Sequence, residues 1–440
     1  MSFMNKLAYG VGRSLRMVLQ KMGRGGNLPG KVANAISPAI LTELTKGYKI
    51  ILVTGTNGKT TTTSLIYQIL LEAGYSVLSN RDGSNMTQGI TTAFLQKSPE
   101  PDKENWAVIE VDEAYLRKVT KLIQTEAIVL TNIFRDQMDR YGEIYTTFKL
   151  LNEGIVRAPE AKIICNGDFP LFSTIKAKDC VFFGFEKGTI HDGSSLKNVC
   201  SLICPSCGTI LNYSQITYSN LGDYYCTGCG KRRPELDYAV KDYHLYENHS
   251  DIVIGDSHFT VPLPGLFNVY NFLGAYALAK SLGITDETIQ KGSMKNLERQ
   301  GRQEHLHLDE TDVILHLVKN PVGLTETIRL LSFYPEPLTI VFLLNNQDAD
   351  GVDESWVWDA DLSLFRTLTK SRFVIGGDCE DTVYLRLRVE GVEDAQITRT
   401  QDFDEVHHEI LTSKTPIVLA SYTANRRIRS RLIQGQQADS

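Results

Sequence analysis

The chain has 440 residues, of which 42% are hydrophobic, and its formal net charge is −6. This length predicts two or three domains with cores of their own. The acidic balance argues against a general nucleic-acid-binding protein. No apolar run approaches the roughly 18 residues that a membrane-spanning helix needs, so we predict a soluble, cytoplasmic protein.

Residues 1–46 form a basic N-terminal arm. All six of its Lys and Arg residues up to Lys31 precede the first acidic residue, Glu43. Two interpretations stay open. The arm contacts anionic phosphates of lipids or of a lipid-linked substrate, or it forms an amphipathic helix packed on its own protein.

Residues 48–74 predict a buried strand, a phosphate loop and a helix. The apolar run from Lys49 to Val53 leads into Gly55-Thr56-Asn57-Gly58-Lys59-Thr60-Thr61, helical spacing of apolar residues follows, and Gly74 can cap the helix. Glycines let backbone N–H groups converge on an anion at a helix N-terminus. The Lys of such a loop reaches the terminal phosphates and the following hydroxyl holds Mg²⁺.

From residue 48 to about 190, strands and helices alternate, which predicts an α/β fold with a parallel sheet covered on both faces. Ligands of such sheets bind beyond the carboxyl ends of the strands. The expected strands are Lys49–Val53, Ser76–Leu78, Trp106–Val111, Ala127–Leu130, Lys162–Cys165 and Cys180–Phe185.

Carboxylates follow the third of these strands. Glu110 is the natural second Mg²⁺ ligand, because hard oxygen ligands suit that ion. Asp112 and Glu113 are interpreted as helix caps rather than metal ligands.

Two Cys-x2-Cys pairs interrupt the domain between about 200 and 232. Their spacing is typical of a structural zinc ribbon, and four thiolates leave no open position for catalysis. The predicted zinc ligands are Cys204, Cys207, Cys226 and Cys229.

After the insert, a pair of strands is expected between Asp251 and Pro264, followed by an alanine-rich helix, Phe272 to Leu282. Asn268 and Asn271 lie one turn apart, so both amides can face one edge of a ligand. Gly301-Arg302 is the expected hinge into the last domain.

Residues 303–440 predict a smaller Rossmann-like domain. Its expected strands are Val313–Leu317, Leu338–Leu344, Phe373–Gly376 and Ile417–Ala420. Residues 345–359 combine many acids with two tryptophans on one loop, which indicates a site or an interface. A surface turn with helix caps is the alternative.

Taken together, these motifs resemble the Mur ligase family. The resemblance rests on the phosphate loop, Glu110, Thr131-Asn132 with Asp136-Gln137-Met138-Asp139-Arg140, Asn268 with Asn271, and Gly301-Arg302. The cysteine insert and the loop from Asp350 to Trp356 are similar to a narrower branch, the synthetase subunits of lipid II isoglutaminyl synthases.

The resemblance implies a Mur ligase-like ATP-binding central domain at residues 47–302, with the zinc ribbon at 200–232 as an insert. The C-terminal domain, 303–440, would contact a GatD-like glutaminase subunit in a heterodimer. The reaction implied is ATP-dependent amidation of the D-glutamate α-carboxylate of lipid II to D-isoglutamine. It proceeds through an acyl phosphate with ammonia from the glutaminase, at the inner face of the cell membrane, during peptidoglycan synthesis.

The resemblance also implies roles for single residues. ATP would be bound by the phosphate loop, with Lys59 and Arg302 on its phosphates and Asn268 and Asn271 facing adenine. Thr60 and Glu110 would hold Mg²⁺. Asp353, or as second choice Asp350, matches the aspartate that this branch lends to the Cys and His of its glutaminase partner.

The sequence departs from ordinary Mur ligases in three places. Gln137 and Lys319 stand where those enzymes usually have His, and only a short arm precedes the first strand where they carry a uridine nucleotide-binding domain. The short arm favours a lipid-linked substrate. No carbamylated lysine is identified, although Lys149 is one option.

Two other functions stay open. One is a ligase that adds an amino acid instead of ammonia, and the other is a zinc-ribbon scaffold that binds nucleotide or nucleic acid without catalysis.

Overall fold

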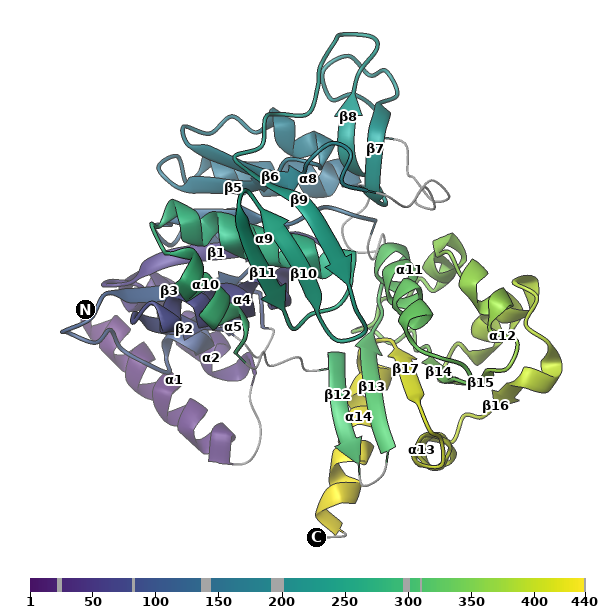
Figure 1. Cartoon of the computed structure of the whole chain (residues 1–440). Helices are drawn as coiled ribbons and strands as arrows, with labels where there is room; N and C mark the ends of the chain where they lie inside the picture. Colours follow the sequence, from purple (N-terminus) through teal and green to yellow (C-terminus); the bar gives the residue numbers. More distant parts are fainter. Residues whose placement is uncertain are drawn as a thin grey trace. The chain divides into compact units, whose positions relative to one another are not determined.

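The computed structural model describes residues 1–21, 26–80, 84–135, 144–190, 202–295, 301–308 and 311–438 (Figure 1). The chain divides into two compact units. The first comprises Met1–Phe134 and Ile144–Leu297, and the second comprises Arg135–Glu143 and Glu298–Ser440. No helix in the described ranges is both long and apolar enough to cross a membrane.

Nine of the described strands of the first unit form one sheet, in the order β11-β10-β9-β6-β5-β4-β1-β3-β2. Pairing is parallel from β2 to β9, and β10 and β11 extend the sheet as antiparallel strands. The strands are β1 (Lys49–Thr54), β2 (Ser76–Ser79), β3 (Asn105–Glu110), β4 (Ala127–Leu130), β5 (Lys162–Asn166), β6 (Cys180–Phe185), β9 (Tyr238–Leu245), β10 (Ser250–Ile254) and β11 (Ser257–Val261).

Helices pack on both faces of this sheet. α4, α9 and α10 contact one another, and α4 and α9 also contact strands of the sheet. The chain moves from β1 outward to β2 and then back through β3 and β4 to β5, so right-handed crossovers place α5, α6 and α8 on the face opposite to α4. The helices are α4 (Lys59–Glu72), α5 (Thr87–Phe94), α6 (Leu116–Val119), α8 (Ile144–Val156), α9 (Leu266–Ser281) and α10 (Asp286–Ser293).

The N-terminal arm forms three helices, α1 (Phe3–Lys21), α2 (Leu28–Ile36) and α3 (Ile40–Leu44). Ala8 of α1 and Ala33 of α2 are fully buried in a cluster with Ile40 and Leu95. A Cβ at Gly12 would lie 2.8 Å from the Leu95 side chain, so α1 approaches closely there. The arm does therefore pack on its own protein.

The six strands predicted between residues 48 and 190 all form, within one residue at either end, and the pair predicted after the insert forms as β10 and β11, although β11 ends three residues before Pro264. The structure adds β9, which the sequence analysis did not predict because its charged residues, such as Lys241 and Asp242, break the apolar pattern. α9 begins at Leu266, six residues before the predicted Phe272. The cysteine insert contains a small antiparallel pair, β7 (Asn212–Tyr218) and β8 (Leu221–Tyr225).

In the second unit, described strands form a six-stranded sheet in the order β12-β13-β17-β14-β15-β16. Only β12 is antiparallel to its neighbour. The strands are β12 (Arg302–Leu308), β13 (Thr311–Leu317), β14 (Thr339–Leu343), β15 (Arg372–Gly376), β16 (Ile397–Arg399) and β17 (Pro416–Ala420). The α-helices are α11 (Pro321–Leu330), α12 (Glu380–Val389), α13 (Phe403–Leu411) and α14 (Tyr422–Ala438).

Alternation along the central strand β14 builds two cores. Ile340 and Phe342 join the hydrophobic cluster that includes α11 and α12, whereas Val341 and Leu343 join the cluster that includes α13 and α14. This is the helix-covered arrangement of a Rossmann-like sheet, as predicted. β12 and β16 were not predicted, since both are short or polar edge strands.

Candidate active site and cysteine cluster

The loop between β1 and α4 has the backbone of a phosphate loop. Gly55 and Gly58 have φ values of +133° and +86°, in the region that favours glycine. A Cβ at Gly55 would lie 2.2 Å from the Thr131 hydroxyl, and one at Gly58 would lie 1.9 Å from the Asn271 side-chain oxygen. Both glycines are therefore required by conformation and by space.

The end of β4 supports this loop. The backbone N–H of Asn57 donates to Oδ1 of Asn132 at 2.9 Å, and the Thr131 hydroxyl donates to the carbonyl of Asn57 at 2.8 Å. The N–H of Thr56 donates to the carbonyl of Asn132 at 2.9 Å. These bonds fix the loop between two neighbouring parallel strands.

Thr60 lies in the first turn of α4 and Glu110 is the last residue of β3. The Thr60 hydroxyl donates to Oε2 of Glu110 at 2.7 Å, and Nδ2 of Asn85 donates to Oε1 at 3.1 Å. Glu110 is 4% exposed, and its backbone exchanges two 2.8 Å hydrogen bonds with the Asn80 side chain. A hydroxyl and a carboxylate, both hard oxygen ligands for a metal ion, therefore meet beside the loop.

The Lys59 ammonium lies over the loop. It donates to the carbonyl of Gly55 and to that of Thr56, the latter at 3.2 Å, and it pairs with Oε2 of Glu113 at 3.3 Å. Both side chains of this ion pair are about nine-tenths buried. Asp112 does cap the following turn, because its Oδ1 accepts the N–H of Ala114 at 3.0 Å.

Glu113 was not predicted to be the partner of Lys59. Glu113 was interpreted as a helix cap, but α6 begins only at Leu116. The available signal was topological: Glu113 follows β3, whose carboxyl end lies beside that of β1.

The two asparagines of α9 lie together, as their spacing predicts. Nδ2 of Asn271 donates to Oδ1 of Asn268 at 3.0 Å, and Nδ2 of Asn268 donates to the carbonyl of Pro264 at 2.8 Å. Both residues are buried, and Asn271 lies against Gly58. The structure therefore brings the asparagine pair to the phosphate loop from a distant part of the chain.

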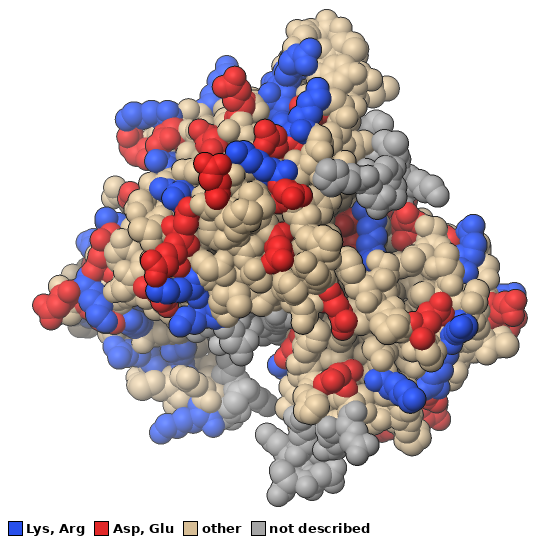
Figure 2. Space-filling model, in the orientation of Figure 1, with Lys and Arg blue, Asp and Glu red and all other residues tan. Residues whose placement is uncertain are grey.

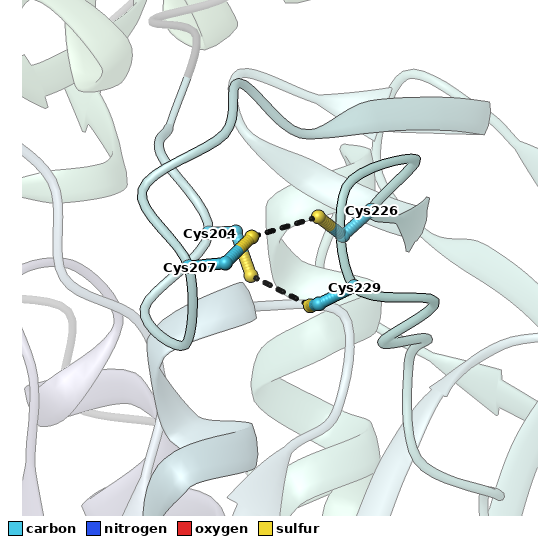
Figure 3. A group of neighbouring side chains, drawn as sticks. All are labelled: Cys204, Cys207, Cys226 and Cys229. Atoms are coloured by element: carbon cyan, nitrogen blue, oxygen red, sulfur yellow. Dashed lines mark hydrogen bonds between the residues drawn. The ribbon is translucent and has the colours of Figure 1, made fainter.

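The four cysteines of the insert converge on one point (Figure 3). The Sγ atoms of Cys204 and Cys229 are 3.7 Å apart, those of Cys207 and Cys226 are 3.4 Å apart, and all four lie within 4.8 Å of one another. Zn–S bonds of 2.3 Å in a tetrahedron require sulfur atoms about 3.8 Å apart, so the cluster fits one zinc ion.

The two Cys-x2-Cys turns have the same backbone. The N–H of Gly208 donates to the carbonyl of Cys204 at 2.9 Å, and the N–H of Gly230 donates to that of Cys226 at 3.0 Å. Both glycines have positive φ, +76° and +74°. Hydrogen bonding with Thr209 lowers the pKa of Cys207 to about 6, which favours the thiolate that binds metal.

A buried ion pair anchors the insert to the sheet. Nη1 of Arg233 lies 2.5 Å from Oδ1 of Asp168, whose Oδ2 accepts the Tyr270 hydroxyl at 2.5 Å. Burial raises the pKa of Asp168, and the positive charge of Arg233 opposes that shift. This network connects the end of the insert to α9 and was not predicted.

Comparison with known proteins identifies the family. A model of the Mur ligase middle domain matches residues 53–203, and a model of the MurT ligase C-terminal region matches residues 317–425. The chain is 42% identical over 431 residues to the MurT subunit of lipid II isoglutaminyl synthase (glutamine-hydrolyzing) from Streptococcus pneumoniae, covering 97% of this chain and 96% of that protein. The chain belongs to the MurT family.

A second MurT relative, from Staphylococcus aureus strain COL, is 33% identical over 376 residues, 84% of each chain. Solved structures show the same fold. A pseudomurein peptide ligase type C from Methanothermus fervidus has a TM-score of 0.67 at 20% identity, covering 90% of this chain and 80% of that one. A MurF ligase from Thermotoga maritima in complex with ADP has a TM-score of 0.63 at 15% identity, with 93% and 85% covered.

The MurT C-terminal match includes residues 345–359 of the second unit, the loop that combines many acids with two tryptophans. Asp350 is 7% exposed, and its carboxylate accepts the N–H and the hydroxyl of Thr423 at 2.7 and 2.5 Å, so it caps the start of α14. Asp353 is half-buried and accepts the N–H of Ser355 at 2.9 Å. Hydrogen bonds from Ser355 lower the pKa of Asp353, which keeps it ionised.

The remaining residues that were compared with the Mur ligase family lie in different parts of the chain. Arg302 begins β12 in the second unit, and Lys149 is exposed on α8 in the first. Asn320, which follows Lys319, caps α11 by accepting the N–H of Gly323 at 2.8 Å. Residues 136–140, including Gln137, lie outside the described residues.

Proposed function

We propose that this chain is the synthetase subunit of a lipid II isoglutaminyl synthase. It would use ATP to amidate the α-carboxylate of D-glutamate in the lipid II stem peptide to D-isoglutamine during peptidoglycan synthesis. The proposal rests on one observation above the others: Thr60 and Glu110 meet beside the glycine loop between β1 and α4, in a chain 42% identical to a MurT subunit.

A carboxylate is a poor electrophile, so it needs activation before ammonia can attack. In the proposed reaction, an oxygen of the substrate carboxylate attacks the γ-phosphorus of ATP and ADP leaves, which gives an acyl phosphate. Ammonia then attacks the carbonyl carbon, and inorganic phosphate leaves as the amide forms. Catalysis of such steps depends mainly on positioning and on neutralising the transferring phosphoryl group.

Each part of the loop has a proposed role. The backbone from Gly55 to Thr61 binds the phosphates at the N-terminus of α4, and Lys59 exchanges its contact with Glu113 for the terminal phosphates. Asn268 and Asn271 bind adenine. Arg302 would add a phosphate contact, as the family resemblance implies.

Two metals complete the proposal. Thr60 and Glu110 would hold Mg²⁺, which neutralises charge on the ATP phosphates. Cys204, Cys207, Cys226 and Cys229 would hold one structural zinc ion, which stabilises the insert.

The proposed domain limits are 1–46 for the arm, 47–302 for the ATP-binding domain with the ribbon at 200–232, and 303–440 for the C-terminal domain. The last domain would bind a GatD-like glutaminase that supplies ammonia. Val352 and Trp358, which flank Asp353, are 62% and 44% exposed, and such exposed apolar side chains around a charged residue suit an interface. Asp353 would orient the imidazole of the glutaminase site.

The experiment is a reconstitution. The chain is purified with its glutaminase subunit and given ATP, Mg²⁺, glutamine and lipid II, and mass spectrometry measures the amidated stem peptide. A Lys59→Ala variant should lose the product, and equal amidation by that variant would refute the mechanism. Turnover with a free amino acid and no partner would favour an amino-acid-adding ligase instead.

The proposed site of action is the cytoplasmic face of the cell membrane, where a lipid-linked substrate is available. The chain would therefore contact the membrane peripherally, since no helix among the described residues is long and apolar enough to span a bilayer.

A further inference from the structure

The N-terminal helix α1 has a buried face and an exposed face of different chemistry. Its buried residues, Asn5, Ala8 and Gly12, lie on one side of the helix. There the Ser37 hydroxyl donates to Oδ1 of Asn5 at 2.5 Å, and Ala8 joins the hydrophobic cluster of the arm. The inner face is thus fixed to the protein, which leaves the opposite side without a described neighbour in this unit.

That opposite side is unusually apolar. Seven of the 21 exposed large hydrophobic side chains in the described residues occur within the first 18 positions. Phe3, Leu7 and Val11 are spaced four residues apart and are 80%, 45% and 39% exposed, so they form a continuous stripe along α1. Val18 continues the stripe two turns later at 55% exposure.

Positive charge flanks the stripe. Lys6 and Arg13, both exposed, are seven residues apart, so they share one flank of the helix, and Lys21 ends it. No acidic residue occurs before Glu43, although the whole chain has a net charge of −6. In Figure 2, blue and tan atoms without red ones cover the lower left part of the view, where Figure 1 draws α1.

We infer that α1 is a membrane-surface helix that lies in the headgroup region of an anionic lipid leaflet. Helices that lie at a membrane surface typically have an apolar stripe flanked by basic residues, and α1 has both features and no acidic residue. The long Lys and Arg side chains reach lipid phosphates while the stripe enters the acyl boundary. The arm is the basic part of a chain whose net charge is −6, so it is the part that an anionic surface attracts.

The stripe and basic flank of α1 would make the peripheral membrane contact proposed above. Only the purpose of that contact, access to a lipid-linked substrate, rests on the proposed function. A lipid-linked substrate stays in the membrane, so an enzyme held at the leaflet meets it at a higher local concentration.

The test measures binding of the full chain to vesicles by flotation. Vesicles of phosphatidylcholine mixed equally with phosphatidylglycerol should bind the chain, and vesicles of phosphatidylcholine alone should bind it at least about tenfold more weakly. The double variant Leu7→Ser, Val11→Ser should lose about tenfold or more in affinity for the mixed vesicles. Lys6→Gln with Arg13→Gln should lose a similar amount and most of the salt dependence.

Val389→Ser is the matched control, because Val389 is 67% exposed on α12 and should leave binding unchanged. Unchanged melting temperatures show that the variants are folded. Equal binding to both kinds of vesicle, or unchanged binding by the Leu7 and Val11 variant, would overturn the inference. So would loss of the glutaminase subunit or a changed oligomeric state in that variant, because the stripe would then be a protein interface.

A second readout separates this inference from the proposed function. In detergent, where lipid II needs no membrane, the Leu7 and Val11 variant should amidate it at the normal rate. If the chain bound vesicles normally but did not amidate lipid II, the proposed function would be refuted and membrane binding by α1 would still be supported.

Discussion

The hydroxyl of Thr60 donates a hydrogen bond of 2.7 Å to Oε2 of Glu110, which joins the start of α4 to the end of β3. The two residues are 50 positions apart in sequence, and parallel pairing of β1 with β3 brings them together. Asn85 holds the other carboxylate oxygen of Glu110 at 3.1 Å, so the carboxylate has a fixed orientation. A cation bound beside the loop would therefore meet an ionised oxygen already aimed at it.

The first prediction concerns this carboxylate. Glu110→Gln keeps the size of the side chain but removes the negative charge that a divalent cation needs, so Mg²⁺-dependent ADP formation should fall about 100-fold. Titration of ADP release against Mg²⁺ measures the effect, and the midpoint should shift to higher Mg²⁺. Glu104→Gln, at an exposed position, is the control and should behave as the unchanged protein. An unaltered Mg²⁺ midpoint in Glu110→Gln would show that Glu110 does not bind the metal.

The second prediction separates Asp350 from Asp353. Asp350 caps α14 through two hydrogen bonds with Thr423, so Asp350→Ala should lower the free energy of unfolding by about 1–2 kcal/mol. Asp353 bonds only locally with Ser355 among the contacts described, so Asp353→Asn should melt at nearly the normal temperature. Thermal unfolding of both variants makes this comparison.

Amidation assays should show a separate role for Asp353. Asp353→Asn should abolish amidation driven by glutamine, while added ammonium salt restores it, because the substitution removes a charge needed only in the partner's glutaminase site. Mass spectrometry of lipid II with either nitrogen source is the measurement. If ammonium failed as completely as glutamine, Asp353 would belong to the synthetase site.

The third prediction concerns zinc. Cys207→Ser removes one of four clustered sulfur atoms, so the purified variant should hold less than one zinc ion per chain by elemental analysis. Structural zinc contributes about 10 kcal/mol or more, so amide hydrogens of β7 and β8 should then exchange rapidly. Cys180→Ser lies outside the cluster and should keep both the metal and the protection. A full zinc content in Cys207→Ser would contradict a four-cysteine site.

The sequence predicted most of what depends on local pattern. The phosphate loop was predicted because Gly55 and Gly58 permit the positive φ values of a tight turn between an apolar strand and a helix that starts with Lys and Thr. The cysteine cluster followed from spacing alone, since each Cys-x2-Cys turn is self-contained. Glu110 was expected near the loop because it ends an apolar strand, and ligands of parallel sheets bind beyond the carboxyl ends of the strands.

Relationships between distant residues could not be predicted in the same way. The Lys59–Glu113 ion pair and the Asp168–Arg233 pair each join segments more than 50 residues apart, and no local pattern distinguishes those acids from ordinary surface residues. β9 was missed because its place between β6 and β10 stabilises a strand with little apolar alternation of its own. The exposed stripe of α1 required knowledge of which helix face is buried.

The last prediction concerns pH and the second unit. Glu326 of α11 is 6% exposed, and burial raises the pKa of its carboxyl to about 7, although Arg329 at 2.6 Å opposes the shift. Because the folded-state pKa lies above the ordinary value of 4.5, folding is favoured while the carboxyl is protonated. That stability is fully present below about pH 4.5 and is lost as the pH rises through about 7.

Glu326→Gln imitates the protonated form at every pH and should remove this dependence. Between pH 5 and pH 8 the unfolding free energy of the unchanged chain should fall by up to about 3 kcal/mol more than that of the variant. Thermal unfolding of both proteins at several pH values measures the difference. Asp381→Asn, an exposed carboxylate on α12, is the control and should keep the original slope. Parallel slopes for Glu326→Gln and the unchanged chain would show that Glu326 stays ionised throughout, with Arg329 compensating its burial.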